Sequence, residues 1–448
     1  MVDMNGKVPE LSKLITNDPE KLDNSLKENE KLGFILKKNP ASGMIKRIMC
    51  DGELSAYYYK DHPGYYVMYF HDYTGSSFGN ENTYLNPTQY TSPQSIINII
   101  HELFQIQNKK MDIDPDMENI NSLHIAMVRI DTIKSIKQLC NKFQDFNINF
   151  ESVDAPVGNL SHYYSVSIKT FKSIHYLLNF TLMIFITISS LNSSGTYTVT
   201  DSVAKKLVGC INNINSPYFV RYLIASRILL RKDFYALKSD LEMYEGHKLV
   251  LHPGNTAEHR RNYIKSLLSF KNDIVDIGCG DGFYAIPYSK NLVESSYHAF
   301  DIDQEQLDKL KKKISKGNIS NINVYESRDE FFDKLSTLNN ADIIITEVVE
   351  HMGEDQSREF LIDVLSIVDK KANIVIITTP NFEFNVNYCS EAKFRHDDHK
   401  WEMTRDQFKD FMNDIITSCE LSCDVEFVGI GDIVDDVPCT QGCILRFH

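Results

Sequence analysis

The chain has 448 residues, of which 42% are hydrophobic and 24% charged, so a fibrous or wholly disordered protein is excluded and two or three domains with substantial cores are expected. The formal net charge of -14 excludes an extensive non-specific nucleic-acid surface, because affinity for phosphates comes from Lys and Arg, but it leaves room for a local basic groove.

The start of the chain and its most apolar stretch decide whether a membrane is expected. The first ten residues are polar and include Asp3 and Pro9, unlike the basic and then apolar start of a secretory signal. The most apolar window, 177–191, is shorter than the ~20 residues of a membrane span and contains Asn179. We therefore expect a buried helix here, no membrane, and a cytoplasmic protein whose nine cysteines are free thiols in a reducing compartment.

Residues 1–240 are predicted to form an α+β domain. A charged helical segment precedes strand-like runs that begin at 32–40 and continue through the aromatic stretch 64–73. A Ser-Pro start and a helical period predict a helix over 92–107, and strands and helices then alternate until the apolar helix and the closing segment 217–230. No cluster of acids, nucleophiles or metal ligands occurs in this part of the sequence, so we expect its histidines to be structural.

A glycine-rich turn opens the second predicted domain, 241–448. The stretch DIVDIGCGDG (273–282) has the pattern of a buried strand that runs into a tight turn and then a helix, and Gly278 and Gly280 let the backbone approach a ligand closely. The G-x-G-x-G spacing, with Asp276 in the preceding strand, favours S-adenosylmethionine over a dinucleotide, because this sulfonium cofactor has no pyrophosphate to place at a helix N-terminus.

The next two strands are predicted to complete the cofactor pocket. The first ends at Asp301, about twenty residues beyond the glycine turn, where a carboxylate accepts hydrogen bonds from ribose hydroxyls. The second, 321–327, ends with Glu326 and Ser327, which we expect to cover the adenine edge. The lysine-rich helix between them is interpreted as a solvated face.

A predicted metal half-site follows in ADIIITEVVEHM (341–352), a short buried strand with an acidic turn and the start of a helix. Glu347, Glu350 and His351 recur at i, i+3 and i+4, so on a helix their side chains share one face. Each residue taken singly also fits a solvated helix end, and only a second cluster of ligands favours the metal.

That second cluster lies in KFRHDDHKWEMTR (393–405), where His396 and His399 flank two aspartates. Imidazole and carboxylate ligands together suit a borderline-to-hard divalent ion such as Mn, Mg, Co or Fe. Both histidines are therefore candidate ligands for the same ion.

The order of elements predicts how these motifs meet. Strands and helices alternate through 341–448, which predicts a parallel, doubly wound sheet with ligands at the carboxyl ends of its strands. The glycine turn, Asp301, Glu347 and Pro380 all lie at such ends, so one site is implied.

Four cysteines near the end of the chain form two C-x3-C pairs, Cys419 with Cys423 and Cys439 with Cys443. They fit either a zinc site or free thiols packed in a terminal β-hairpin. Because the second pair lies in a strand-like segment, the sequence favours the thiols.

The motifs resemble, in order and spacing, the catalytic domain of the small-RNA 3′-terminal ribose 2′-O-methyltransferases, the HUA ENHANCER family, and its bacterial RNA-repair homologues. The resemblance covers about 251–448 and rests on DIGCGDG, EVVEHM, TTPNFEFN, FRHDDHKWEMTR and VEFVGIG…CTQ. The stretches LGFILKKNP, HYYSVSI and LMIFITISSLNSSGTYTVTDSVAKKLV resemble the N-terminal region of the bacterial branch.

The resemblance implies an α/β fold in which a Rossmann-like S-adenosylmethionine-dependent methyltransferase domain, with a seven-stranded and mostly parallel sheet, follows the α+β domain. It also implies Mn- or Mg-dependent methyl transfer to the 2′-hydroxyl of an RNA 3′ end with free 2′,3′-hydroxyls, for RNA repair or small-RNA stabilisation, and a polynucleotide kinase-phosphatase-ligase as partner. The predicted site residues are, for the cofactor, Asp276, Gly278, Gly280, Asp301, Glu326 and Ser327; for the metal, Glu347, Glu350, His351 and His399; for catalysis, His351, His399 and Glu347; and for RNA, Arg260, Arg261, Thr379, Pro380, Asn381 and Arg395.

The sequence departs from the family pattern in two places. LHPGN (251–255) stands where the family has Pro-Pro or Pro-Leu, and Trp401 and Met403 stand where it has Phe and Trp. We therefore expect different loop contacts and a different stacking surface, and either Arg260 or Arg261 corresponds to the family arginine.

Two other functions fit the same sequence. A methyltransferase of a small hydroxylated molecule would use the same fold with another acceptor, since fold alone does not determine function. A mainly non-catalytic activator of an RNA ligase would act through residues 1–240. Metal dependence of methyl transfer discriminates the first alternative, and co-purification of a ligase discriminates the second.

Overall fold

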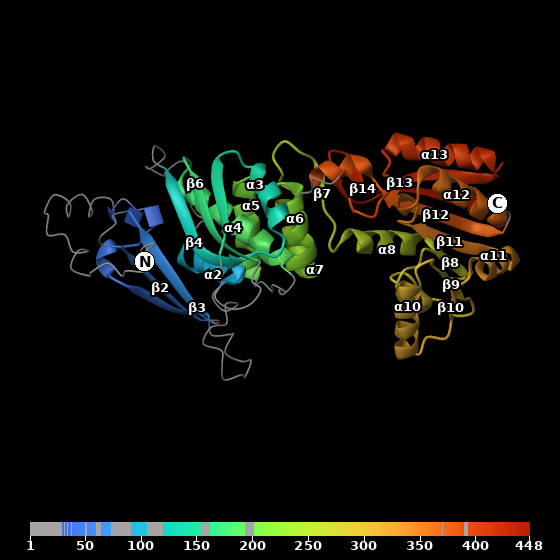
Figure 1. Cartoon of the computed structure of the whole chain (residues 1–448), viewed down its shortest axis with the longest axis horizontal. Helices are drawn as coiled ribbons and strands as arrows, with labels where there is room; N and C mark the ends of the chain where they lie inside the picture. The colour runs from blue at the N-terminus through green and yellow to red at the C-terminus, as the bar shows by residue number, and fades with distance from the viewer. Residues whose placement is uncertain are drawn as a thin grey trace. The chain divides into compact units, whose positions relative to one another are not determined.

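Two compact units make up the chain. The structure is a computed structural model that describes residues 29–30, 32–33, 35–36, 38–49, 52–59, 64–72, 91–104, 120–153, 162–192, 201–369, 371–388 and 393–448. By their contacts, one unit comprises Met1–Ser216 with Arg227–Leu229, and the other comprises Pro217–Ser226 with Leu230–His448. Figure 1 colours the elements of the N-terminal unit from blue to green and those of the C-terminal unit from green to red.

The N-terminal unit begins with a three-stranded antiparallel sheet in the order β1-β2-β3, formed by Ile45–Met49 (β1), Gly52–Tyr58 (β2) and Tyr66–Asp72 (β3). The described residues of 29–36 are helical, so the prediction that strand-like runs begin at 32–40 is wrong. Leu32, Ile35 and Leu36 follow a helical spacing, and Ile35 and Leu36 are buried. Such a short apolar run does not separate a helix from a strand by periodicity alone.

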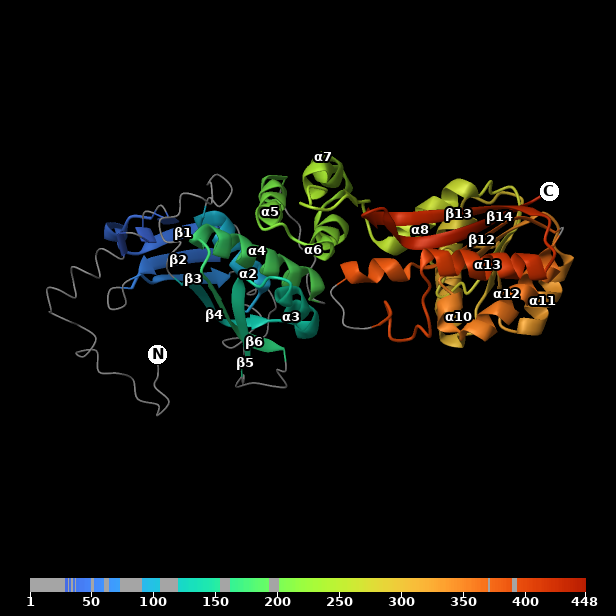
Figure 2. The same cartoon turned by 90° about the horizontal axis from the view of Figure 1, so that it is seen from above.

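A second antiparallel sheet, in the order β4-β6-β5, is packed with helices around one central helix. Helix α4 contacts α2, α3, α5, β4 and β6 and is therefore the centre of this layer (Figure 2). The elements are α2 (Pro93–Leu103), β4 (Asn121–Arg129), α3 (Ile133–Asn141), β5 (Phe146–Ser152), β6 (Tyr163–Thr170), α4 (Ile174–Leu191) and α5 (Asp201–Asn213).

Helix α4 is the buried helix predicted for the most apolar window. Among the described residues it alone has the length and apolar composition of a membrane span, and 83% of it is buried inside the structure. Its polar residues are accommodated locally: the hydroxyls of Thr181, Thr187 and Ser190 donate to the carbonyls one turn earlier. Because these hydroxyls are hydrogen-bonded within the helix, the helix can be buried in the core without unsatisfied polar groups at these positions.

The C-terminal unit is built on an eight-stranded sheet in the order β10-β9-β8-β11-β12-β14-β13-β7. The first five strands in this order are parallel, and β14, β13 and β7 are antiparallel. Seven of them match the predicted mostly parallel sheet, and the two-residue β7 is added at the edge. The strands are β7 (Leu249–Val250), β8 (Ile274–Ile277), β9 (Tyr297–Phe300), β10 (Ile322–Tyr325), β11 (Ala341–Thr346), β12 (Ala372–Pro380), β13 (Cys423–Val434) and β14 (Val437–Phe447).

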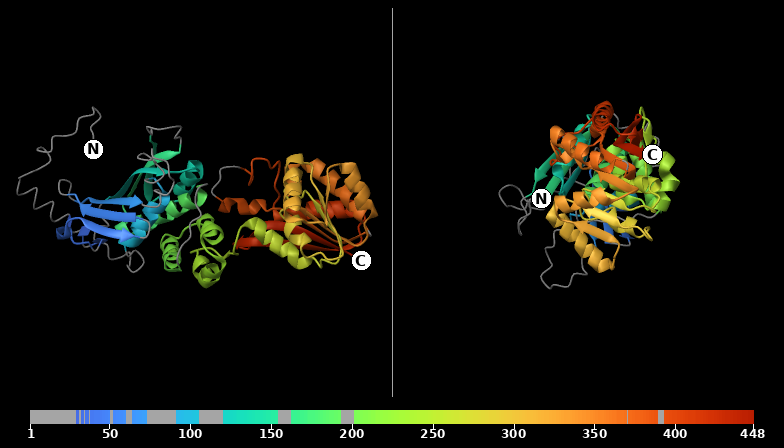
Figure 3. Two further views of the ribbon diagram at one scale, coloured as in Figure 1. Left: turned by 90° about the horizontal axis from the view of Figure 1, so that it is seen from below. Right: turned by 90° about the vertical axis from the view of Figure 1, so that its right-hand side faces the viewer.

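Helices cover both faces of this sheet (Figures 1 and 3). One core is formed with α11, α12 and α13 and includes Ile343 and Ile345, and the other is formed with α8, α9 and α10 and includes Ile344. Because both faces are covered, every residue of β11 is buried, and the centre of the strand is a continuous apolar run, Ile343 to Ile345, instead of an alternation of apolar and polar residues. The helices are α8 (Thr256–Leu267), α9 (Ala285–Ser289), α10 (Gln304–Gly317), α11 (Arg328–Thr337), α12 (Glu354–Val368) and α13 (Arg405–Ser418).

Two further helices precede this sheet and belong to the C-terminal unit by contacts: α6 (Tyr218–Leu223) and α7 (Arg231–Leu241), joined by a π-helical turn at Ile224–Ile228. Tyr218 donates to Asp432 of β13 at 2.9 Å and packs edge-on against Phe384 at 5.0 Å. The division by contacts thus falls before the boundary predicted at 240/241, which stays a prediction.

The described cysteines are free thiols, as predicted: Cys140, Cys210, Cys279, Cys419, Cys423, Cys439 and Cys443. Cys423, Cys439 and Cys443 lie in the terminal hairpin, whereas Cys419 is the C-cap of α13. The two clusters of metal-ligand type found among the described residues contain no cysteine.

Candidate active site at the carboxyl ends of β8, β11 and β12

The glycine turn follows β8 directly. Gly278 and Gly280 have φ of 80° and 53°, in the left-handed region that favours glycine. A β-carbon on Gly278 would lie 2.4 Å from Cγ2 of Val348, whereas one on Gly280 would meet nothing within 4 Å. The turn therefore packs directly against the segment after β11, which brings the two predicted motifs together.

Asp301 lies just beyond the end of β9 and holds this turn. Its Oδ2 accepts from the backbone N of Gly280 at 2.7 Å, and its Oδ1 accepts from that of Asp303 at 2.9 Å. The neighbouring Ile302 is 91% exposed, so an apolar side chain stands open to solvent beside the carboxylate. This combination fits the ribose and base of a nucleoside cofactor.

Glu326 and Ser327 lie at the end of β10, beside β9, as predicted. The hydroxyl of Ser327 is the N-cap of α11, and Glu326 forms an ion pair with Lys311 of α10. Lys313 pairs with Asp281 in the glycine turn at 2.6 Å. Two lysines of the helix interpreted as a solvated face thus link α10 to residues around the predicted pocket.

Asp276 lies inside the sheet and is fully buried. Its Oδ2 accepts from the hydroxyl of Tyr297 at 2.7 Å, and its Oδ1 is buried without a partner. Burial raises the pKa of Asp276 to about 7. A cofactor contact by this carboxylate stays a prediction, while its bond to Tyr297 ties β8 to β9 beneath the turn.

The acidic motif after β11 forms a tight turn, so the prediction that Glu347, Glu350 and His351 share a face of an α-helix is wrong. Glu347 has φ of 54°, Val349–His351 is a single 3-10 turn, and α12 begins only at Glu354. The backbone N of Glu347 donates to the Thr378 carbonyl at 2.9 Å, which keeps the turn on β12. Tertiary contacts, not a regular helix, bring these side chains together.

The turn is joined to the second histidine cluster by backbone and side-chain hydrogen bonds. The backbone N of Lys400 donates to the Glu350 carbonyl at 2.8 Å, and Nε1 of Trp401 donates to the Val349 carbonyl at 2.9 Å. The rings of His351 and His399 are therefore 4.9 Å apart. Both predicted half-sites form one site.

Three of the four predicted metal ligands converge: Glu350, His351 and His399 offer ligand atoms within 4.8 Å of one another. Glu350 is 1% exposed; Thr379 donates to its Oε2 at 3.1 Å, and its Oε1 is buried without a partner. Burial, and then the nearby Glu347 carboxylate, raise the pKa of Glu350 well above its ordinary value. An unpartnered buried carboxylate oxygen beside two imidazoles fits a divalent cation, which would supply the missing positive charge.

Glu402 orients His399 and was not predicted. Nδ1 of His399 lies 2.6 Å from Oε1 of Glu402, and both side chains are almost fully buried. Although burial opposes it, hydrogen bonds from His399, the Arg395 backbone and Asn385 lower the pKa of Glu402. A carboxylate that holds Nδ1 leaves Nε2 for a metal, the usual arrangement around a ligating histidine. The signal in the sequence was a Glu three residues after the histidine.

His351 is the more accessible of the two imidazoles. Its Nδ1 lies 3.1 Å from Asp398, and its side chain is 41% exposed. Burial of the ring lowers the pKa of His351, opposed by the Asp398 carboxylate. His396 is exposed, and its ring is 5.2 Å from that of His399, but it is not among the three converging ligands.

Glu347 faces an arginine. Its Oε2 is 3.2 Å from Nη1 of Arg260 on α8, and although burial opposes it, this carboxylate raises the pKa of Arg260. Arg261 instead lies over the ring of Phe283 at 4.3 Å. Of the two candidate arginines, Arg260 thus contacts the turn after β11 (347–351, called the metal turn below), whereas Arg261 packs on Phe283.

The residues predicted to contact RNA at the end of β12 lie inside the unit. Thr379 is fully buried and bonded to Glu350, and the amide of Asn381 is fully buried between Pro438 and Glu383. Pro380, the last residue of β12, lies between them. These positions hold the turn in place, so a direct RNA contact through them stays a prediction.

Arg395 is half-buried, donates to the Cys439 carbonyl at 2.6 Å and lies over the ring of Tyr388 at 5.2 Å. Its Nε has no partner. Because this nitrogen is buried, a phosphate contact by Arg395 stays a prediction.

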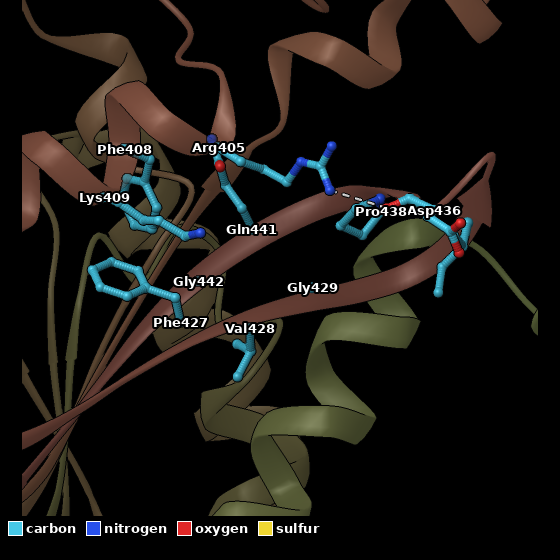
Figure 4. Close-up of a pocket in the computed structure, with 11 residues that line it drawn as sticks. Arg405, Phe408, Lys409, Phe427, Val428, Gly429, Asp436, Pro438, Gln441 and Gly442 are labelled. Carbon is cyan, nitrogen blue, oxygen red and sulfur yellow. Dashed lines mark hydrogen bonds between the residues drawn. The ribbon is translucent and has the colours of Figure 1, made fainter.

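Two surface pockets flank the C-terminal unit. The pocket in Figure 4 has a volume of about 340 Å³, lies between α13 and the β13–β14 hairpin, and contains none of the predicted site residues. A second, of about 540 Å³, is lined by Glu402 together with Phe382, Phe394 and Trp401. The aromatic pocket therefore adjoins the His399 side of the site.

The sheet order, the glycine turn with Asp301, and the adjoining turn at Glu350 define the C-terminal unit as a methyltransferase domain of the S-adenosylmethionine-dependent class. Residues 274–371 match the family model for a methyltransferase domain, and residues 25–246 match that for the Hen1 N-terminal domain. The chain therefore combines a Hen1 N-terminal domain with a methyltransferase domain, and its curated homologues are named small RNA 2′-O-methyltransferase, in agreement with the resemblance of the motifs.

Curated relatives share part of the sequence. A small RNA 2′-O-methyltransferase of Arabidopsis thaliana is 34% identical over 187 residues, 36% of this chain and 19% of the relative. One of Gallus gallus is 38% identical over 99 residues, 21% of this chain and 25% of the relative. The matches thus span about a fifth to a quarter of the length of these relatives.

A solved chain described as part of the Pnkp1/Rnl/Hen1 RNA repair complex has the same fold from end to end. It aligns with a TM-score of 0.75 and 24% identity, over 94% of this chain and 98% of its own length. A second structure of a Pnkp1/Rnl/Hen1 complex aligns with a TM-score of 0.70 over the same shares. The predicted fold, an α+β domain followed by a Rossmann-like methyltransferase domain, is confirmed.

Proposed function

We propose that the C-terminal unit transfers a methyl group from S-adenosylmethionine to the 2′-hydroxyl of the 3′-terminal ribose of an RNA, with a divalent cation, Mn or Mg, at Glu350, His351 and His399. The observation that carries the proposal is the packing of the glycine turn against the metal turn, with Gly278 against Val348. A cofactor site and a cation site that share a wall place a methyl donor beside a bound hydroxyl. The homologues named small RNA 2′-O-methyltransferase support RNA as the acceptor.

A cation bound here would act as a Lewis acid and lower the pKa of the ribose hydroxyl, which is a poor nucleophile near neutral pH. The side chains of the protein position the groups of the site and accept the proton of the ribose hydroxyl. Glu402 fixes the ring of His399, and Arg260 holds the carboxylate of Glu347 at the edge of the site. A nitrogen that binds the cation cannot also accept a proton, so Glu347, the predicted catalytic residue outside the three converging ligands, is the candidate proton acceptor.

Methyl transfer from labelled S-adenosylmethionine tests the proposal. The substrate is a short RNA that ends in 2′,3′-hydroxyls, compared with matched RNAs that end in a 2′-deoxyribose or a 3′-phosphate, each with Mn, with Mg and with chelator. We expect transfer only to the free diol and only with metal, after which the end resists periodate. Transfer to no RNA would favour a small hydroxylated acceptor, or a mainly activating role.

Replacement of Glu347 separates catalysis from cofactor binding. We expect Glu347→Gln to lower kcat at least about 10-fold while the Kd for S-adenosylmethionine stays within about twofold, because the side chain lies on the cation side of the turn. Glu354→Gln, an exposed change at the start of α12, is the control. Equal loss of cofactor binding would show that Glu347 is structural.

We also propose a role in RNA repair, with the N-terminal unit binding an RNA ligase of the kinase-phosphatase-ligase type. The end-to-end fold similarity to a chain of the Pnkp1/Rnl/Hen1 RNA repair complex supports this partner. Co-expression with such a ligase, followed by size-exclusion chromatography, tests this partner. Co-elution that requires residues 1–216 is expected, and elution as separate proteins contradicts the proposal.

We also propose a cytoplasmic location, which cell fractionation tests.

A further inference from the structure

The C-terminal unit contains a second cluster of residues that could bind a metal. These residues lie on other elements than Glu350, His351 and His399, which form the catalytic set. His252, in the segment between β7 and α8, His259 of α8 and Asp432 of β13 offer ligand atoms within 4.8 Å of one another. The carboxylate of Asp432 is 1% exposed and the His259 side chain 4%, while that of His252 is 45% exposed. The cluster is therefore closed on the protein side and open to solvent through a single imidazole.

The imidazoles lack other partners. Nδ1 of His252 and both ring nitrogens of His259 are buried and make no hydrogen bond. The backbone of His252 and Pro253 lies near the His259 ring without hydrogen-bond geometry. A buried imidazole with two unsatisfied nitrogens costs free energy unless a ligand satisfies one of them.

The distances fit ligation better than hydrogen bonding. Oδ1 of Asp432 lies 3.4 Å from Nδ1 of His252 and 3.9 Å from Nδ1 of His259. A tetrahedral zinc ion with bonds of about 2.0–2.2 Å separates its ligand atoms by about 3.4 Å. The Asp432 oxygen is thus close to the ligand spacing from both imidazoles, and all three ligand atoms lie within 4.8 Å of one another.

The backbone of β13 is shaped to present this carboxylate. The register of β13 against β14 shifts between Ile430 and Ile433, a bulge of the kind that re-aims a side chain. Gly431 in this bulge has φ of 84°, and a β-carbon there would lie 3.3 Å from Nδ1 of His259 and 2.6 Å from Sγ of Cys439. Glycine lets the imidazole approach the strand.

Two further hydrogen bonds orient the carboxylate from behind. Oδ2 of Asp432 accepts from the hydroxyl of Tyr218 on α6 at 2.9 Å, and Oδ1 accepts from the backbone N of His252 at 2.8 Å. Support of a ligating carboxylate by hydrogen bonds is a regular feature of metal sites.

We propose that His252, His259 and Asp432 bind a zinc-type divalent cation, separate from the cation proposed at Glu350, His351 and His399, that ties the segment before α8, α8 itself and β13 together. Two imidazoles and one carboxylate are a normal zinc ligand set, with water at the fourth position. The ion fixes the first turns of α8, and the next residue after His259 is Arg260, which contacts Glu347. The second ion thus supports the catalytic site from outside.

Zinc binding by the full chain tests this site, independently of methyl transfer. The background is the variant His351→Ala/His399→Ala, which lacks both imidazoles of the catalytic set. Equilibrium dialysis against Zn²⁺ with elemental analysis is expected to give one equivalent in this background and two in the wild type. Co²⁺ in place of Zn²⁺ is expected to give the visible absorption bands of a tetrahedral site in the same background.

His252→Ala, added to this background, removes the half-exposed ligand and leaves the buried ones in place. We expect it to weaken zinc binding at least about 100-fold and to abolish the Co²⁺ bands, with the circular dichroism spectrum unchanged. His247→Ala is the matched control, because His247 forms a surface pair with Asp435 at 2.7 Å outside the cluster. No bound zinc in the background variant, or undiminished binding after His252→Ala, would overturn the proposal.

Discussion

At the scale of single residues, Glu402 shows how one buried carboxylate organises the site. It accepts from His399 and from the backbone N of Arg395, each at 2.6 Å, and from Asn385, so its charge is matched by three donors. Such a network holds the imidazole in one tautomer and one orientation. The orientation of His399 therefore depends on a buried carboxylate three residues further along the chain.

We predict that Glu402→Gln lowers the affinity for Mn about 10- to 100-fold, because an amide orients His399 less strongly than a carboxylate does. Metal titration of methyl transfer measures this, and kcat at saturating Mn is expected to recover most of its value. The control is Glu383→Gln, which breaks a partly exposed pair with Arg405. An unchanged Mn dependence would mean that Glu402 only fills space.

Asp276 gives a prediction about pH. Burial raises its pKa from 3.8 to about 7 in the folded protein, so the native state binds a proton that the unfolded chain releases between these values. The free energy of unfolding therefore falls as the pH rises from about 4 to 7, by up to about 4 kcal/mol from this group. Asp276→Asn should flatten that fall, measured by urea unfolding at several pH values without cofactor. Identical pH dependence in wild type and variant would contradict the prediction.

At the scale of elements, the site consists of turns held between strand ends. The glycine turn after β8 and the 3-10 turn after β11 touch through Gly278 and Val348, and the loop before α13 closes on them through Lys400 and Trp401. Parallel strands side by side place these turns at one edge of the sheet. Contacts between turns that are far apart in the sequence, and not the helix or strand propensity of any one segment, thus form the site.

We predict that Gly278→Ala weakens S-adenosylmethionine binding at least about 10-fold, because a β-carbon strains a φ of 80° and meets Val348. The double variant Gly278→Ala/Val348→Ala removes the clash and should recover part of the affinity, measured by calorimetry. Gly246→Ala is the control for the effect of backbone strain without a steric clash, because φ is 81° at Gly246 and a β-carbon there meets nothing within 4 Å. No recovery in the double variant would show that the contact is unimportant.

At the scale of the whole molecule, the two units have separate cores, and the C-terminal one includes α6 and α7 by contacts. We predict that the fragment 217–448 folds cooperatively by itself. The fragment 241–448 should have a lower Tm by several degrees, because it loses Tyr218, whose hydroxyl bonds Asp432 and whose ring packs on Phe384. Scanning calorimetry of both fragments measures this, and equal Tm values would support the boundary at 240/241.

The sequence by itself determined the fold class and most of the site. The glycine turn, the buried strand 341–346 with its run of three isoleucines and the alternation of strands and helices carry local signals, because hydrophobic period and turn chemistry act over a few residues. The same local order placed Glu350 and His351 in the turn after β11, and the loop before α13 brings His399 beside them.

Only the tertiary structure decided which side chains meet. It separated Arg260 from Arg261, buried Thr379 and Asn381, and joined Glu402 to His399, because these outcomes depend on packing between segments far apart in the chain. The cluster of His252, His259 and Asp432 is the clearest case. His252 and Asp432, which are joined by a hydrogen bond, are 180 residues apart in the sequence. A bulge in the last hairpin brings them together, and no spacing of residues in the sequence predicts such a contact.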